Sequence, residues 1–398
     1  MQRFFFYLLV SWAFLPTTSL HSQPKFDLIP VDQAAASFNT VTSTVHQVGE
    51  AHYLYSAGDG EKIDIYQISE DGNIEPVGVQ DTYQSRKGIR GLVADTIAGK
   101  NFLFAGLKGA NAVEVFEINP DGSLSSAFVT PDTDSTYLVR VITLQVIHLA
   151  SGDYLYAGGL EKPAGLSAYK IAPSGELTHL QSMADTEEIH TDGIIGMSIH
   201  EIDGTTYLYT GGFQDNGLSS FRISEDGTFE NLNNIADDHT LFLNGAYPVI
   251  SATKQGWRFV VVGHRHHTYY RPTPWVKDRH TYYHHGDAVS VFLVNEKGEV
   301  NPRSAFRDNT ETLIQGQTRL QKLPLDDNFD LIAVATRDDQ SLQLFALNET
   351  GRLIEAGNVK TGFPIYYGLS GQKIGDKLFL FAGAVSDNTI VSYRLDPK

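Results

Sequence analysis

The stretch YLYTGGFQDNGLSSFRISEDG, residues 207–227, contains the features that decide the fold. An apolar run ending in two glycines (207–212) is followed by a short polar loop, an alternating run (217–223) and a turn that ends at Gly227. Alternation of apolar and polar residues predicts a β-strand with one buried face, and glycine supplies the positive φ of a tight turn. The stretch therefore predicts two antiparallel strands and a turn into a third.

The same unit recurs seven times along the chain. Its apolar strands begin at Tyr53, Phe102, Tyr154, Tyr207, Phe259, Leu331 and Phe379. Six of the alternating partners are followed by a glycine turn, at Gly72, Gly122, Gly175, Gly227, Gly298 and Gly351. A period of about fifty residues with several strands in each unit is typical of a propeller. We therefore expect an all-β fold, a seven-bladed β-propeller of four-stranded antiparallel blades.

The two ends of the chain complement each other. The seventh unit stops at Leu395, before its turn and outer strand, whereas 25–32 (KFDLIPVD) matches the outer strand expected at 228–237 (TFENLNNIAD). We expect the N-terminal strand of the mature chain to complete the last blade, because ring closure removes exposed strand edges. One propeller is predicted over residues 23–398, with a hairpin insertion in the fifth blade at 264–286.

Composition and the first residues suggest an exported protein. Residues 1–22 have a signal-peptide pattern, with Arg3 before an apolar stretch at 4–15, so we expect a secreted or periplasmic location. A net charge of −17 disfavours nucleic acid and anionic membranes as partners, and no later run is apolar for long enough to span a bilayer. Since the chain has no cysteine, its stability must come from packing. We expect a monomer.

Propeller geometry predicts which residues surround one mouth of the central channel. The start of each innermost strand and the loop after the second strand share a rim, and loops on rigid scaffolds concentrate binding function. Counting twelve residues back from each apolar strand gives Arg90, Ile142, Ile195, Tyr247, Arg319 and Tyr367, with Arg140 and Asp192 as neighbouring possibilities. The loops add Lys108, Glu161, Lys162, Gln214, Asp215, His264, Arg265, Arg337 and Asp338. This collar of cations and aromatic rings suits an anionic ligand, and we expect an anionic carbohydrate.

The insertion HRHHTYYRPTPWVKDRHTYYHHGD (264–287) holds six of the 14 histidines. Three interpretations stay open. It is a surface hairpin held by aromatic cross-strand pairs, a zinc site built from clustered imidazoles, or a carbohydrate-binding wall that includes His267 and Tyr270.

The rhythm YLYxGG…VxVFxIxxDGxL resembles the lactonase-like seven-bladed propellers over essentially the whole mature chain. The Arg-His pair and the DGKYLYV run usual in the 6-phosphogluconolactonase branch are absent. The collar is similar to that of exported seven-bladed ulvan lyases, where Tyr, His and Arg gather at the propeller centre. That resemblance implies Tyr247 as acid or base, Arg265 as neutraliser of a substrate carboxylate, and His264 or His200 as their partner. The substrate-binding residues we expect are Arg90, Arg319, Tyr367, Arg337, His267 and Tyr270.

Three functions are compatible with this collar. β-Elimination on a uronic-acid polysaccharide needs a cation beside the carboxylate, a base and an acid, and we take a lyase for an acidic, ulvan-like polysaccharide as the leading hypothesis. It requires no cofactor, although bound zinc or calcium stays open. The first alternative is hydrolysis of a sugar or organic-acid lactone, with a metal held by carboxylates such as Glu161, Asp192, Asp215 and Asp338. The second is a non-catalytic binding propeller.

Overall fold

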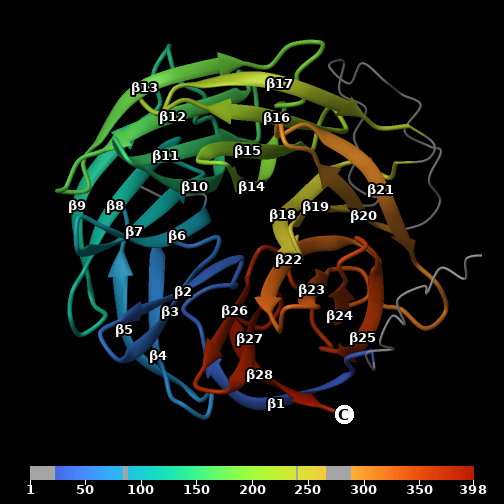
Figure 1. The fold of residues 1–398 in the computed structure, drawn as a ribbon. Helices are drawn as coiled ribbons and strands as arrows, with labels where there is room; N and C mark the ends of the chain where they lie inside the picture. Colours follow the sequence, from blue (N-terminus) through green and yellow to red (C-terminus); the bar gives the residue numbers. More distant parts are fainter. Residues whose placement is uncertain (1–22, 84–87, 239–240, 266–287) are drawn as a thin grey trace, which may run out of the picture.

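The computed structural model describes residues 23–83, 88–238, 241–265 and 288–398. These residues form strands and turns, and no helix able to cross a membrane occurs among them. Seven four-stranded antiparallel sheets surround a central axis (Figure 1), which confirms the predicted seven-bladed β-propeller. The predicted leader and all of the insertion except His264 and Arg265 lie outside the described residues.

Each blade runs outward from the channel in chain order. The first three blades contain β2 (Thr42–Val48), β3 (Ala51–Ala57), β4 (Lys62–Ile68) and β5 (Ile74–Asp81), then β6 (Ile89–Ile97), β7 (Lys100–Leu107), β8 (Ala112–Ile118) and β9 (Leu124–Pro131), then β10 (Val141–Leu149), β11 (Gly152–Gly159), β12 (Gly165–Ile171) and β13 (Leu177–Ala184). The fourth and fifth contain β14 (Ile194–Ile202), β15 (Thr205–Gly212), β16 (Gly217–Ile223) and β17 (Phe229–Ala236), then β18 (Ala246–Lys254), β19 (Trp257–His264), β20 (Ala288–Val294) and β21 (Val300–Arg307).

The last two blades complete the ring. The sixth contains β22 (Gln317–Pro324), β23 (Asp330–Thr336), β24 (Ser341–Leu347) and β25 (Leu353–Lys360). The seventh contains β26 (Leu369–Ile374), β27 (Lys377–Ala384) and β28 (Thr389–Pro397), and its outer strand is β1 (Phe26–Ala35). β1 pairs antiparallel with β28 from Phe26 opposite Pro397 to Ala35 opposite Thr389, as the sequence match between the two chain ends suggests.

The glycine turns between the third and fourth strands have two reasons to be glycine. All six have positive φ, from 75° at Gly351 to 89° at Gly175, as predicted. A Cβ at each would also lie only 2.0 to 2.7 Å from a ring atom of the preceding blade. A Cβ at Gly122 in the second blade, for example, would meet the ring of Tyr53, which begins the apolar run of the first blade. The turns therefore connect neighbouring blades as well as reversing the chain.

Blade six shows the same rule by exception. The corresponding position there is Leu331, which has no ring. The next blade has no such turn, because its third and fourth strands, β28 and β1, come from opposite ends of the chain. An aromatic side chain at position 331 would therefore have no turn glycine of the next blade to pack against.

Candidate ligand site at the channel mouth

The structure places the residues counted to the rim close to where expected. Arg90, Ile142, Ile195 and Tyr247 are each the second residue of an innermost strand, and Arg319 is the third of β22. Tyr367 lies two residues before β26 and forms a parallel bridge with Thr42 of β2. Ile142, Ile195 and Tyr247 form one buried cluster against which Tyr367 packs. Residues more than a hundred positions apart thus meet at one end of the channel.

Two tyrosines form the centre of this site. The rings of Tyr247 and Tyr367 stack with centroids 5.2 Å apart and an interplanar angle of 18°. Phe213 meets the Tyr247 ring edge-on at 5.4 Å. Offset stacking and edge contacts are favourable arrangements of aromatic rings, so the Tyr247 ring is held in one orientation.

Arg265 lies beside these rings. Its Cζ is 5.5 Å from the centroids of both the Tyr247 and the Tyr366 rings, within the range of a cation–π interaction. Its Nη1 is 3.5 Å from the Tyr247 hydroxyl, the long limit of a hydrogen bond. The guanidinium and the phenol of Tyr247 can therefore reach one ligand atom together.

Arg319 brings a second guanidinium to the tyrosine pair. Its Nε is buried and has no hydrogen-bond partner within residues 23–83, 88–238, 241–265 and 288–398. Burial lowers the pKa of this arginine, and Tyr367 and Tyr247 partly oppose that effect. A donor buried without an acceptor is unfavourable, so a ligand oxygen at this position would stabilise it.

Both central phenols stay protonated at neutral pH. Burial is the main cause that raises the pKa of Tyr247 well above its ordinary value, and burial likewise raises the pKa of Tyr367. Each can donate a hydrogen bond or a proton to a ligand, whereas neither is available as an anionic base. We call the set of Tyr247, Arg265, Arg319, Tyr366 and Tyr367 the central site.

Tyr366 is a member that the sequence did not reveal. Strand alternation predicts that neighbours of a channel residue point away from the channel. Residues 366 and 367 precede β26 and have no strand geometry that would impose alternation, so both rings reach the arginines. The sequence offered one signal for this, namely that Tyr366 directly precedes the predicted channel residue Tyr367.

The two histidines proposed as catalytic partners are engaged elsewhere. His200, near the far end of β14, is buried and hydrogen-bonds through Nε2 to the carbonyl oxygen of Phe259 at 2.9 Å. His264 accepts a hydrogen bond at Nε2 from the backbone N–H of Ala288 at 2.8 Å and packs against Phe242. His264 therefore joins the ends of β19 and β20, where the insertion leaves and re-enters the blade.

The other predicted binding residues lie outside the central site. Arg337 is buried, and its Nε donates a hydrogen bond to Oδ1 of the neighbouring Asp338 at 2.7 Å. Arg90 forms an ion pair with Asp59 across two blades. His267 and Tyr270 lie outside the described residues.

Of the rim carboxylates proposed for a metal, Asp192 and Asp215 lie close together, whereas Glu161 and Asp338 pair with arginines. Glu161 pairs with Arg140, and Asp192 pairs with Lys162 at 3.2 Å. Burial, followed by the charge of Asp185, raises the pKa of Asp215 well above its usual range. In the described part of the chain, no three His, Asp or Glu side chains are arranged to hold a metal ion.

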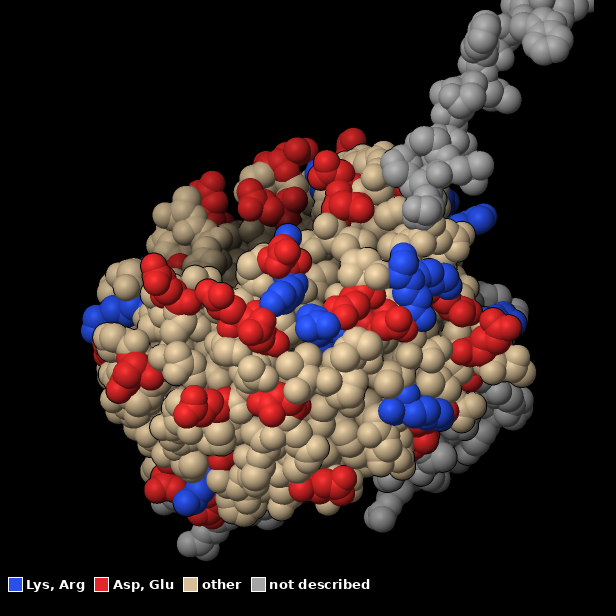
Figure 2. All heavy atoms as spheres, turned by 90° about the horizontal axis from the view of Figure 1, so that it is seen from below, with Lys and Arg blue, Asp and Glu red and all other residues tan. Residues whose placement is uncertain are grey.

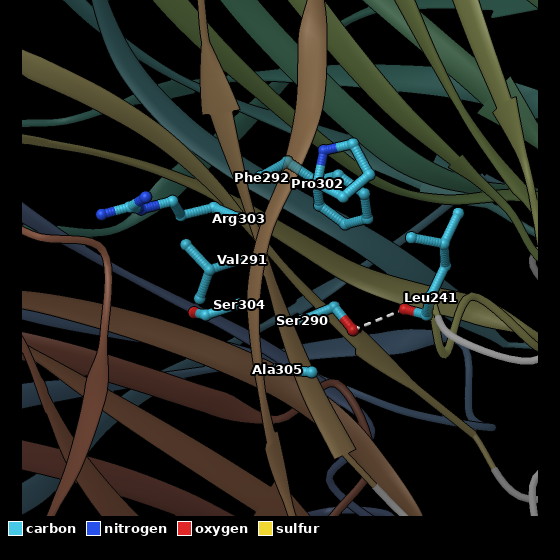
Figure 3. A pocket seen from close by; sticks show the side chains of 8 residues that line it. All are labelled: Leu241, Ser290, Val291, Phe292, Pro302, Arg303, Ser304 and Ala305. Atoms are coloured by element: carbon cyan, nitrogen blue, oxygen red, sulfur yellow. Dashed lines mark hydrogen bonds between the residues drawn. The ribbon is translucent and has the colours of Figure 1, made fainter.

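Charge and cavities elsewhere differ from the channel mouth. On the side of the disc, Asp and Glu are interspersed with Lys and Arg (Figure 2). A cavity of about 220 Å³ lies between β20, β21 and Leu241, where Ser290 donates a hydrogen bond to the Leu241 carbonyl at 2.7 Å (Figure 3). Its lining combines apolar side chains with two serines and one cation, Arg303, and includes none of the tyrosines found at the central site.

Known structures share the fold of this chain. A Lactobacillus plantarum protein has a TM-score of 0.56 and 14% identity, covering 82% of this chain and 85% of its own. A Bacteroides fragilis protein provisionally described as a 6-phosphogluconolactonase has a TM-score of 0.55 and 16% identity, covering 83% and 84%. Saccharomyces cerevisiae Sqt1 has a TM-score of 0.55 and 12% identity, covering 92% and 99%.

These likenesses establish the propeller architecture, and one of these neighbours is provisionally described as a lactonase. They do not bear on the resemblance to ulvan lyases, which stays a prediction. No protein-family model matches the chain. No curated protein matches it by sequence either.

Proposed function

We propose that this protein hydrolyses the lactone of a sugar acid or related organic acid at the central site. The observation that carries the proposal is the meeting of two guanidinium groups, Arg265 and Arg319, with the neutral phenols of Tyr247 and Tyr367. All four groups carry hydrogen-bond donors, although the two phenols also bond to each other, and donors held in place beside a substrate carbonyl stabilise an oxyanion. The likeness in fold to a protein provisionally described as a lactonase supports the same reaction class.

The chemistry requires few groups from the protein. Water adds to the lactone carbonyl carbon, and the carbonyl oxygen becomes an oxyanion that Arg265 and the Tyr247 phenol would stabilise. The ring C–O bond then breaks, one proton of the attacking water passes to the departing ring oxygen, which becomes a hydroxyl, and the other proton is released when the new carboxyl group ionises. The product is a hydroxy acid whose new carboxylate Arg319 would hold. Sugar lactones open slowly in water unaided, so oxyanion stabilisation alone would accelerate the reaction.

The leader predicted at residues 1–22 bears on the substrate. Export would take the protein away from sugar phosphates, which are cytoplasmic. We therefore propose an unphosphorylated lactone as the substrate.

β-Elimination on a uronate polymer is the second candidate, since Arg265 and Tyr247 lie side by side as a neutraliser and a proton donor would. Elimination also needs a base that removes the C5 proton. The Tyr247 phenol is protonated, and His200 and His264 are held by backbone groups. Lactone hydrolysis is favoured because solvent can accept the proton of the attacking water, whereas removal of the C5 proton needs a base of the protein.

One pair of assays tests both reactions. Acid release would be followed with a pH indicator for gluconolactone, galactonolactone and glucarolactone, and absorbance near 235 nm for ulvan, alginate, pectate and glucuronan. Acid release above the uncatalysed rate supports the proposal. A rise at 235 nm without acid release would replace it with the lyase, and silence in both assays would favour a non-catalytic binder.

A further inference from the structure

A second group of cations lies on the same rim, on the second and third blades. Arg90 is at the start of β6, Lys108 in the turn between β7 and β8, and Arg140 directly before β10. Arg90 and Arg140 lower the pKa of Lys108, after the larger effect of burial, so the three charges act on one another. We call Arg90, Lys108 and Arg140 the rim triad.

The charges of the rim triad are incompletely balanced. Arg90 is paired with Asp59 and Arg140 with Glu161. Lys108 is half-buried, and among the described residues no carboxylate forms an ion pair with it. Three cations thus face two carboxylates, Asp59 and Glu161, which raise the pKa of Lys108 and oppose the effect of the two arginines, so that one positive charge is left over. An anion bound there would relieve the repulsion.

Arg140 has a backbone conformation that an arginine ordinarily avoids. In five blades the residue directly before the innermost strand has a left-handed φ. It is glycine in four, at Gly88, Gly193, Gly245 and Gly316, with φ from 62° to 96°. Arg140 occupies the fifth with φ of 51°, and its N–H donates to the Asn111 side chain at 2.9 Å. A left-handed φ is unfavourable for any residue with a Cβ. The arginine side chain at position 140 is therefore present despite a cost in backbone energy.

The rim triad and the central site are electrostatically connected. The charge of Arg90, like that of Arg265, lowers the pKa of Tyr367, although burial outweighs both. Arg90 is therefore near the tyrosine pair as well as beside Lys108. A ligand seated on the tyrosines could extend one end towards Arg319 and the other towards Lys108.

We infer that the rim triad binds a second anionic group of the same ligand, a carboxylate or sulfate, so that the preferred ligand is a dianionic sugar acid or its lactone. This rests on the proposed function in one respect, that the first anionic group is the carboxylate formed at the central site. Guanidinium and ammonium groups together bind such oxyanions through charge-assisted hydrogen bonds.

The test compares open-chain sugar acids by calorimetry. D-gluconate has one charged group, D-glucarate has two carboxylates, and 6-phosphogluconate has a carboxylate and a phosphate. Tighter binding of glucarate than of gluconate is expected, by roughly tenfold for one charge-assisted interaction. If only 6-phosphogluconate shows the preference, the second group is a phosphate, which contradicts the unphosphorylated substrate proposed above.

Two substitutions assign the preference to the rim triad. Arg140→Gly and Lys108→Gln should each bring the ratio of dianion to gluconate affinity towards one. Arg140→Gly should also unfold at a temperature no lower than the unaltered protein, because glycine accepts the left-handed φ. Arg394→Gln removes the same charge from β28, where Arg394 pairs with Asp396, and should keep the ratio.

The outcomes separate the two proposals. A preference that survives both rim substitutions, or none in the unaltered protein, overturns the second anion site even if lactones are hydrolysed. A preference lost in both variants supports the site even if no lactone is hydrolysed. Absence of binding by all three acids contradicts the second anion site, and the acid-release assay then decides separately on lactone hydrolysis.

Discussion

At the scale of single residues, the channel mouth contains an arginine, Arg319, with a buried polar atom that no described residue satisfies. Ser290 and Tyr66, away from the mouth, donate hydrogen bonds to carbonyl groups at 2.7 and 2.8 Å. The Nε of Arg319 is instead buried without a hydrogen-bond partner in the described part of the chain. It belongs to the same site as the phenols of Tyr247 and Tyr367, whose pKa values are raised by burial. Polar groups left unsatisfied in this way cluster at sites that a ligand completes.

The hydroxyl of Tyr247 should matter for rate and little for folding. Tyr247→Phe keeps the ring stacked on Tyr367 and under Arg265, and removes one donor to the oxyanion. We expect kcat/KM for a lactone to fall about a hundredfold, the typical effect of losing one such donor, with little change in the thermal midpoint. Tyr66→Phe removes a buried hydroxyl bonded to the Ala35 carbonyl and serves as the control, with an unchanged rate. Full turnover by Tyr247→Phe would exclude the phenol from the mechanism.

His200 should make the fold sensitive to acid. Burial lowers the pKa of His200 from 6.5 to about 4, so the unfolded chain takes up the proton first as pH falls. The contribution of the neutral imidazole is complete above about pH 6.5 and is lost as pH falls towards 4, with a limit of roughly 3 kcal/mol. Urea unfolding at pH 7 and 4.5 should show a smaller loss for His200→Gln, which keeps a donor for Phe259. Equal losses in the two proteins would show that His200 does not titrate in this way.

At the scale of elements, the turn between the third and fourth strands also forms an inter-blade contact. The first ring of one blade's apolar strand fills the space where the next blade's turn glycine has no side chain. Tyr55 adds a hydrogen bond from its hydroxyl to the Gly122 carbonyl at 3.0 Å. Because interiors are close-packed, this contact has no room for one more carbon.

Two glycine substitutions separate backbone strain from this contact. Gly122 and Gly99 have φ of 79° and 82°, but a Cβ at Gly122 would lie 2.2 Å from the Tyr53 ring, whereas one at Gly99 has nothing within 4 Å. Gly99→Ala should cost about 1 kcal/mol of unfolding free energy and Gly122→Ala about 2 to 4 kcal/mol, from strain plus overpacking. Urea unfolding measures both. Equal costs would mean that the ring moves aside freely.

At the scale of the whole molecule, the ring is closed by strands from the two ends of the chain. β1 pairs along β28, and the N–H of Lys398 donates to the carbonyl of Lys25 at 2.9 Å. The inner face of β1 joins the core of the sixth and seventh blades through Phe26 and Leu28. Closure of this kind covers the edge of β28, which would otherwise be open to pairing with another chain.

Neighbouring residues of β1 should respond oppositely to a charge. Leu28 is 6% exposed and packs into the core, whereas Ile29, on the other face of the strand, is 40% exposed. Leu28→Asp should lower the unfolding free energy by about 3 kcal/mol or more, since it buries an unpaired carboxylate, and Ile29→Asp by less than about 1 kcal/mol. Thermal unfolding with light scattering measures both. Comparable stability of the two variants would show that β1 contributes little to closure.

The sequence by itself determined the strands, the number of blades and the channel residues such as Arg90 and Tyr247. The reason is that period-2 alternation and turn glycines are local patterns repeated seven times, so each copy supports the alignment of the others. It also suggested the match of the chain ends, because one unit lacked the strand that another segment supplied.

Only the tertiary structure decided which rim residues act together. The interpretation of His200 and His264 as catalytic partners depended on residue type, and their backbone partners in neighbouring segments were invisible in the sequence. Tyr366 joined the central site because the chain there leaves strand geometry. The strained φ of Arg140 likewise became visible only beside its glycine counterparts. The histidine partners and the contact of Tyr366 with Arg265 join segments far apart in the sequence, which local pattern does not encode.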